Sequence, residues 1–101
     1  MKKIINKKLY DTDTAKEVAT HNNGLSWGDF YFINETLYQK RTGEFFLFGH
    51  GGAMTEYGEH RYGSWTSGSN IFPLTEDEAK EWVAEYCDAV TYIAIFGKVE
   101  E

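Results

Sequence analysis

The chain has 101 residues, of which 42% are hydrophobic and 17% aromatic, so it contains too many core-forming side chains for a disordered protein and fits one small domain. No apolar run approaches the ~20 residues of a membrane-spanning helix, and the first residues lack the features of a signal peptide, which predicts a cytoplasmic protein with no membrane contact. Ten Lys and Arg against sixteen Asp and Glu give a net charge of -6, and this sign argues against direct DNA binding and favours a basic protein partner.

The N-terminal quarter is expected to contain one strand or small hairpin and one helix. The segment Lys2 to Tyr10 has short β-friendly pieces on either side of Asn6-Lys7. Thr14 and Glu17 then have the spacing of a capping box, and Asn23-Gly24 is a helix stop. The spacing predicts a helix of about two turns between these signals.

The middle of the chain predicts a β-hairpin. The stretches "DFYFINETLYQK" and "EFFLFGH" are rich in aromatic and β-branched residues and flank "RTG", where Gly43 is placed for a left-handed turn residue. The second stretch is apolar on both faces, which is typical of a central strand covered on both sides. The following residues, Gly49 to Asn70, hold six of the ten glycines and are expected to form a long loop.

The C-terminal third predicts one amphipathic helix and one uniformly apolar segment. We expect a short strand at Ile71-Phe72 that ends at Pro73, because proline cannot donate to a β-ladder. A second capping box, from Thr75 to Glu78, precedes an apolar stripe at i, i+3, i+4, i+7 that comprises Ala79, Trp82, Val83 and Tyr86. The last segment, "DAVTYIAIF", fits a buried helix or a final strand, with the helix favoured. An apolar helix at this position could form a homodimer through residues 88–97.

These elements together predict an α+β fold. We expect a single domain over residues 1–101, in which two or three helices pack on an antiparallel sheet of about three to five strands, with a glycine- and aromatic-rich loop at 49–70.

The chemistry-bearing residues do not form a recognisable catalytic motif. "GHGG" at Gly49 is followed by no Lys-Ser/Thr pair, as a phosphate loop would require. His50, Glu56, Glu59 and His60 could be assembled into a metal site, but the His-Glu-x-x-His spacing and a second cysteine besides Cys87 are both missing. A non-enzymatic protein without a cofactor is therefore favoured, and a small metal-binding protein that uses His50 and His60 is kept as an alternative.

Three stretches of the chain resemble a known group of proteins. "KKIINKKLYDTDTAKEVA", "ETLYQKRTGEFFLFGHGGAMTEY" and "IFPLTEDEAKEWVAEY" are similar to small phage- and plasmid-borne proteins of low-GC bacteria, within which anti-CRISPR proteins are found. The resemblance runs from Lys2 to Gly97. It departs at the last segment, which is richer in acids in that group and reads "AVTYIAIFG" here.

The resemblance implies an anti-CRISPR protein that acts in the cytoplasm of a bacterial host. Such a protein would bind a CRISPR-Cas effector or its guide-RNA complex, with a type II nuclease favoured, and block DNA binding or cleavage through an acidic surface that mimics DNA. The expected partner-binding residues are Glu76, Asp77, Glu78, Glu81 and Glu85 as the acidic face, with Tyr57, Tyr62 and Trp65 as aromatic anchors. The alternative is a phage or plasmid accessory protein that binds another host protein.

Overall fold

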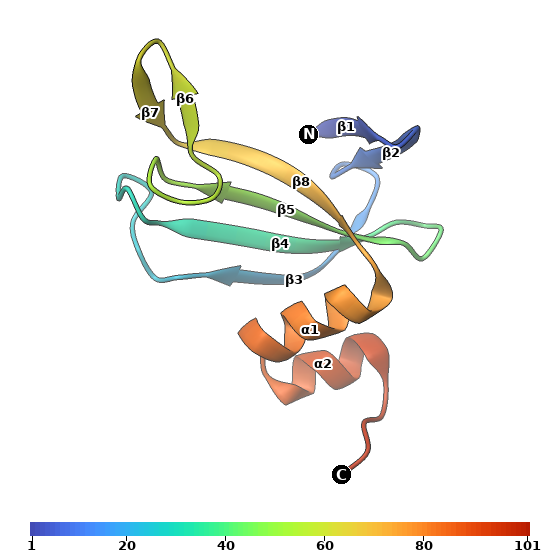
Figure 1. Ribbon diagram of the computed structural model, residues 1–101. Helices are drawn as coiled ribbons and strands as arrows, with labels where there is room; N and C mark the ends of the chain where they lie inside the picture. The colour runs from blue at the N-terminus through green and yellow to red at the C-terminus, as the bar shows by residue number, and fades with distance from the viewer.

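The computed structural model describes all residues from Met1 to Glu101 and has the expected α+β fold (Figure 1). In chain order the elements are β1 (Lys2–Ile5), β2 (Lys8–Asp11), β3 (Lys16–Asn22), β4 (Ile33–Gln39), β5 (Phe45–Gly51), β6 (Glu59–Arg61), β7 (Ser64–Thr66), β8 (Gly68–Leu74), α1 (Glu76–Tyr86) and α2 (Ala89–Phe96). Neither helix is long and apolar enough to cross a membrane.

The main sheet is antiparallel and has the strand order β3-β4-β5-β8. The predicted hairpin is confirmed as β4–β5, with the left-handed Gly43 (φ 94°) in its turn. β5 lies between β4 and β8, and most of its residues are buried. The prediction of a central strand covered on both sides is therefore confirmed.

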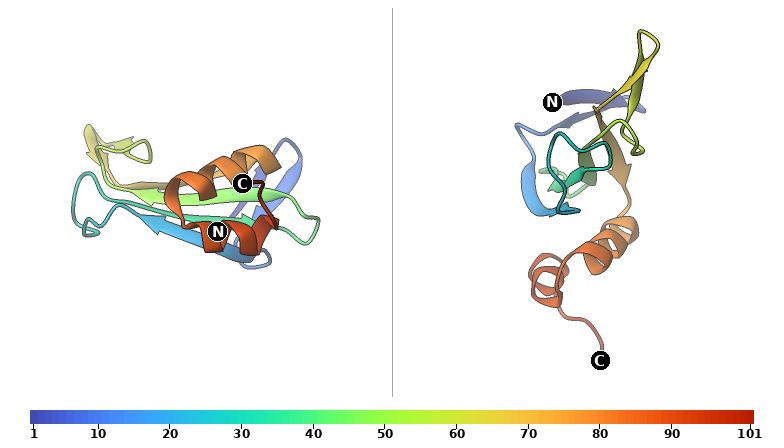
Figure 2. Two further views of the ribbon diagram at one scale, coloured as in Figure 1. Left: turned by 90° about the horizontal axis from the view of Figure 1, so that it is seen from below. Right: turned by 90° about the vertical axis from the view of Figure 1, so that its left-hand side faces the viewer.

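The two faces of this sheet are covered by different parts of the chain (Figures 1 and 2). One face packs against α1 and α2 through a core cluster that consists of Leu37, Phe45, Leu47, Ala79, Trp82 and Val83. The other face packs against the β1–β2 hairpin, where Tyr10, Phe46 and Ile71 form a second buried cluster. Adjacent residues of β5, such as Phe46 and Leu47, thus belong to opposite cores, as the two-residue period of a strand requires.

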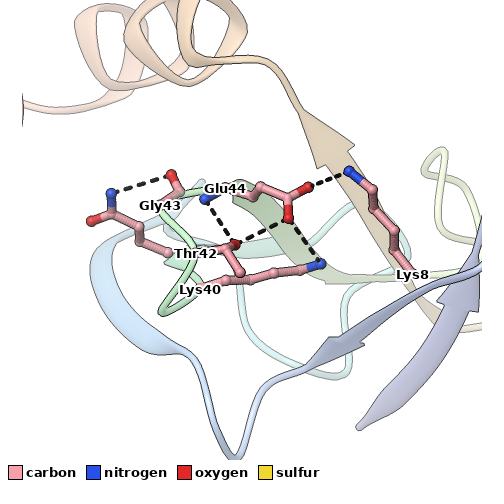
Figure 3. A network of polar contacts seen from close by, with 6 residues as sticks. Lys8, Lys40, Thr42, Gly43 and Glu44 are labelled. Atoms are coloured by element: carbon pink, nitrogen blue, oxygen red, sulfur yellow. Dashed lines mark hydrogen bonds and ion pairs between the residues drawn. The ribbon is translucent and has the colours of Figure 1, made fainter.

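A polar network around Glu44 links the N-terminal hairpin to the β4–β5 turn of the main sheet (Figure 3). The Lys8 ammonium donates to the Glu44 carboxylate at 2.9 Å, and Thr42 Oγ1 donates to the same carboxylate at 3.0 Å. Lys40 Nζ lies 3.9 Å from Glu44 and 3.6 Å from the centre of the Tyr10 ring. These contacts join the β4–β5 turn to β2, and they could not be predicted from the sequence of either segment alone.

The helix predicted between Thr14 and Gly24 is wrong, because Lys16–Asn22 forms the edge strand β3. Thr14 donates weakly to the Asp11 carbonyl at 3.5 Å instead of capping a helix. Val18 and Ala19 pack against the core cluster under the helices. Pairing with β4 along six registered positions outweighs the weak local helix signal.

The region 49–70 is also more ordered than a long loop. β5 continues to Gly51, a small β6–β7 hairpin follows, and β8 begins at Gly68. Pro73 lies within β8, opposite Phe46, and does not end the strand. β8 is an edge strand, where a residue without an amide hydrogen is tolerated.

Candidate protein interfaces

The acidic helix is held in a fixed orientation by its cap and its buried face. Thr75 Oγ1 accepts from the Glu78 amide at 3.1 Å, while Glu78 Oε1 accepts from the Thr75 amide at 2.9 Å, so the predicted capping box is confirmed. Ala79, Trp82 and Val83 are buried, as predicted. Tyr86 is 46% exposed and stacks on His21, with 4.3 Å between ring centres, so it does not belong to the buried stripe.

The acids of α1 are all exposed, but they differ in their intramolecular partners. Glu76 lies 3.8 Å from Lys80, and Glu78 is engaged in the helix cap. Asp77, Glu81 and Glu85 form no ion pair or side-chain hydrogen bond and follow one another at four-residue spacing, which places them on one side of the helix. We call these three residues the acidic stripe.

Tyr57 is not an exposed anchor. It is 3% exposed, and its hydroxyl donates to the carboxylate of Glu35, which is itself buried and also accepts from Trp82 Nε1 at 3.3 Å. Burial, followed by the hydrogen bond to Glu35, raises the pKa of Tyr57 far above its usual value. The expected role of Tyr57 as a contact residue is therefore wrong, since its ring and hydroxyl belong to the core.

The glycine at position 49 makes this arrangement possible. A Cβ atom at Gly49 would lie 2.0 Å from the Tyr57 hydroxyl oxygen and 2.4 Å from a ring carbon. Because the Tyr57 side chain crosses the strand where Gly49 has no side chain, the hydroxyl can reach Glu35 on the neighbouring strand β4. Gly49 in the glycine-rich stretch is thus needed for the packing of the Tyr57 side chain.

Tyr62 and Trp65 are exposed, as an anchor role requires, but they lie far from the acidic helix. Tyr62 is in the turn of the β6–β7 hairpin with φ 51° and is fully exposed, and Trp65 is 60% exposed. The hairpin rises from one side of the sheet, whereas α1 covers the other side (Figures 1 and 2). The predicted acidic and aromatic residues therefore do not form one continuous surface.

A third exposed region was not predicted. Leu25, Trp27, Phe30, Tyr31 and Met54, which we call the aromatic tip, are each between 45% and 66% exposed. The Met54 amide donates to the Phe30 carbonyl at 2.9 Å, and Asn23 Nδ2 donates to the Tyr31 carbonyl at 2.7 Å, so the two loops of the tip are fixed. The sequence predicts that the first hairpin strand begins at Asp29, with Phe30 and Tyr31 within it, whereas β4 begins only at Ile33.

The two histidines considered for metal binding are separated in the structure. His50 Nδ1 lies 2.5 Å from Ser69 Oγ, and its ring packs against Trp27 and Phe32. His60 lies on β6 against Trp65. No group of three or more His, Cys, Asp and Glu side chains is placed to hold a metal ion.

One surface concavity contains a carboxylate, Glu44, that is not prepared to act as a general acid. It has a volume of about 550 Å³, lies between the β4–β5 turn and the helices, and includes Glu44 and Glu76 in its wall. The hydrogen bonds from Lys8 and Thr42 lower the pKa of Glu44. A general acid needs a raised pKa, so this carboxylate is not prepared for that role.

Comparisons of the chain with protein-family models, with curated proteins and with solved structures find no significant match. The surfaces described above are therefore the main structural guide to function.

Proposed function

We propose that this protein is a non-enzymatic inhibitor that binds a CRISPR-Cas effector, with a type II nuclease favoured, and blocks DNA binding or cleavage. The observation that carries the proposal is the acidic stripe, whose three carboxylates are exposed and unpaired on a capped helix. The sequence motifs that resemble the anti-CRISPR-containing group supply the class of target. The acidic stripe supplies the means of contact.

The spacing of the stripe suits a surface that normally holds nucleic acid. Residues four apart on an α-helix are separated by about 6 Å along its axis. Phosphates of one DNA strand advance by about 3.4 Å along the duplex axis and also wind around it, so the stripe imitates the repeated negative charge of a strand. An effector holds nucleic acid in a positively charged channel, where carboxylates at this spacing can occupy phosphate positions.

The aromatic tip favours a second candidate, an accessory protein that binds a different host protein. Exposed Trp, Tyr and Phe side chains on fixed loops are typical of interface hot spots. Such a contact would depend on Trp27 and Phe30 and would be insensitive to the acidic stripe.

The proposal is tested by pulldown of the tagged protein against a panel of purified, guide-loaded type I and type II effectors. DNA-binding and cleavage assays follow on each effector that is retained. The test variant carries Asp77→Lys, Glu81→Lys and Glu85→Lys and keeps Glu78, because Glu78 closes the helix cap. The control variant, with Glu17→Lys, Glu100→Lys and Glu101→Lys, has the same change in net charge at exposed positions outside α1.

We expect the test variant to bind about 10²-fold more weakly and the control to bind like the wild type. An equal loss of effector binding in both variants would show that only net charge matters. Full inhibition by a folded test variant would exclude the acidic stripe as the contact surface. If DNA still binds the effector but is not cleaved, the mechanism would be a block of the effector's conformational change and not DNA mimicry. Failure to bind any effector would favour the second candidate, for which Trp27→Ala is the corresponding variant.

A further inference from the structure

The outer side of α2 is an exposed surface without charge. Residues 89–96 contain no Lys, Arg, Asp or Glu, although 26% of the whole chain is charged. One side of the helix packs on the core through Tyr92, Ile95 and Phe96, and the Phe96 ring centre lies 5.6 Å from that of Phe45. On the other side, Val90 is 77% exposed and Ile93 is 49% exposed.

A groove runs beside these two residues. It has a volume of about 420 Å³ and is lined by the end of α1, α2 and the C-terminal tail, with the lining residues Ala84, Cys87, Asp88, Ala89, Tyr92, Ile93 and Val99. The one ionised group, Asp88, accepts from the Thr91 amide at 2.8 Å as the cap of α2. The lining is therefore mainly apolar and includes the small side chains of Ala84, Cys87 and Ala89.

We propose that this surface is a homodimer interface in which α2 packs against α2 of a second copy. A two-fold interface must present a projection and a matching depression on the same patch of both copies. Val90 is the projection, the groove is the depression, and Ile93 belongs to both. A two-fold rotation can therefore place Val90 of each copy in the groove of the other.

The distribution of charge favours a second copy of the chain as the partner of this surface, and favours α2 over the aromatic tip as the place of contact. Each copy carries a net charge of -6, so two copies meet most readily through a patch with few carboxylates. The groove wall contains one, Asp88, whose carboxylate is engaged in the cap of α2. The loops that carry the aromatic tip also contain the exposed acids Asp29 and Glu56 and no Lys or Arg. A two-fold contact there would therefore bring together more carboxylates than the single Asp88 of each groove. A nucleic acid or a strongly charged partner would find no ionic contact on α2.

This inference goes beyond the proposed inhibitor function and does not depend on it. The dimer would join the α1–α2 pairs of two copies in a four-helix arrangement. Each particle would carry two acidic stripes.

The test is sedimentation equilibrium of the untagged protein from about 1 to 500 μM, since a dimer of modest area is expected to dissociate in the micromolar range. We expect a mass that rises from monomer to dimer with concentration. Higher salt is expected to strengthen the dimer, because it screens the repulsion between two acidic copies.

Two variants locate the contact. Val90→Lys with Ile93→Lys is expected to raise the dimer dissociation constant by at least 30-fold, and Val90→Ser, a milder change at an exposed position, by a smaller factor. Leu25→Lys with Met54→Lys makes the same type of change at the aromatic tip and is expected to leave dimerisation unchanged. A monomer over the whole concentration range would overturn the proposal, as would a dimer that only the tip variant disrupts or one that neither α2 variant weakens.

Discussion

At the residue scale, Glu35 joins three segments that are distant in the sequence. Its carboxylate accepts from Tyr57 in the loop after β5 and from Trp82 in α1, while Glu35 itself lies on β4. The residue is 7% exposed, and no cation is paired with it. Two neutral donors are therefore the main compensation for burying this acid.

Replacement of Tyr57 by Phe removes one of these donors and should lower the free energy of unfolding by about 1–3 kcal/mol at neutral pH. The pH dependence has a definite sign. Because the pKa of Tyr57 is raised in the folded protein, its hydroxyl ionises first in the unfolded state. The stability that depends on the protonated hydroxyl is thus complete below about pH 10 and declines as the pH rises above it.

Chemical denaturation of wild type and Tyr57→Phe between pH 7 and 12 measures both effects. The two stability curves should converge above about pH 10, where only the wild type loses the Tyr57 contribution. Tyr38→Phe is the matched control, because burial also raises the pKa of that half-buried tyrosine without a hydrogen bond to Glu35. A constant difference between wild type and Tyr57→Phe at all pH values would contradict a role for the Tyr57 hydroxyl in alkaline unfolding.

At the element scale, α1 retains repulsion that a purely structural helix would not need. Asp77 and Glu85 each lie four residues from Glu81, and like charges at this spacing destabilise a helix by about 0.2–0.5 kcal/mol per pair. Glu81→Lys converts both repulsive pairs into attractive ones. We expect the variant to be more stable by about 1 kcal/mol, with a melting temperature higher by about 4–8 °C.

Thermal unfolding and effector binding, measured on the same Glu81→Lys protein, separate stability from function. If the acidic stripe serves recognition, we expect Glu81→Lys to have a higher melting temperature and a lower affinity for the effector. Lys80→Glu is the complementary control, because it removes the Glu76 ion pair and adds negative charge on α1 outside the stripe. A Glu81→Lys protein with higher stability and undiminished binding would show that the stripe is only a solvated surface.

Elements with strong local signals could be predicted from the sequence, and those formed by distant pairing could not. The Thr75 cap, the apolar stripe of α1 and the turn at Gly43 are local features, and all three are found in the structure. The Thr14–Glu17 spacing is equally local, but β3 depends on pairing with β4, which no short window reveals. The same holds for the site, since the exposure of the acids followed from helical periodicity, whereas the burial of Tyr57 depends on Gly49 and Glu35.

At the scale of the whole molecule, the two charge types lie on opposite sides of the main sheet. The β1–β2 hairpin contains Lys2, Lys3, Lys7 and Lys8 and covers one face, while α1 with its acids covers the other (Figure 1). Lys8 is held to Glu44, and Lys3 donates to Asn70 at 2.6 Å, so part of the basic side is neutralised internally. Lys2 and Lys7 remain exposed and unpaired on the basic side, and Asp77, Glu81 and Glu85 remain exposed and unpaired in the helix layer.

This asymmetry predicts that a basic partner is attracted over a distance and captured in one orientation. The association rate with an effector identified in the panel should fall by about tenfold or more between 50 and 500 mM salt, because the Debye length shortens from more than 10 Å to less than 5 Å. The dissociation rate should change much less, since contacts already made are screened weakly. Stopped-flow or surface-based kinetics across this range provides both rates.

Two variants test whether the acidic stripe causes this salt dependence. The variant with Lys at positions 77, 81 and 85 should associate slowly at every salt concentration. The variant with the same net charge but Lys at 17, 100 and 101 should keep most of the wild-type dependence of the association rate on salt. A wild-type association rate that does not change with salt would mean that the effector contact is apolar and would move it from the acidic stripe to the aromatic tip, where Trp27 and Phe30 are exposed.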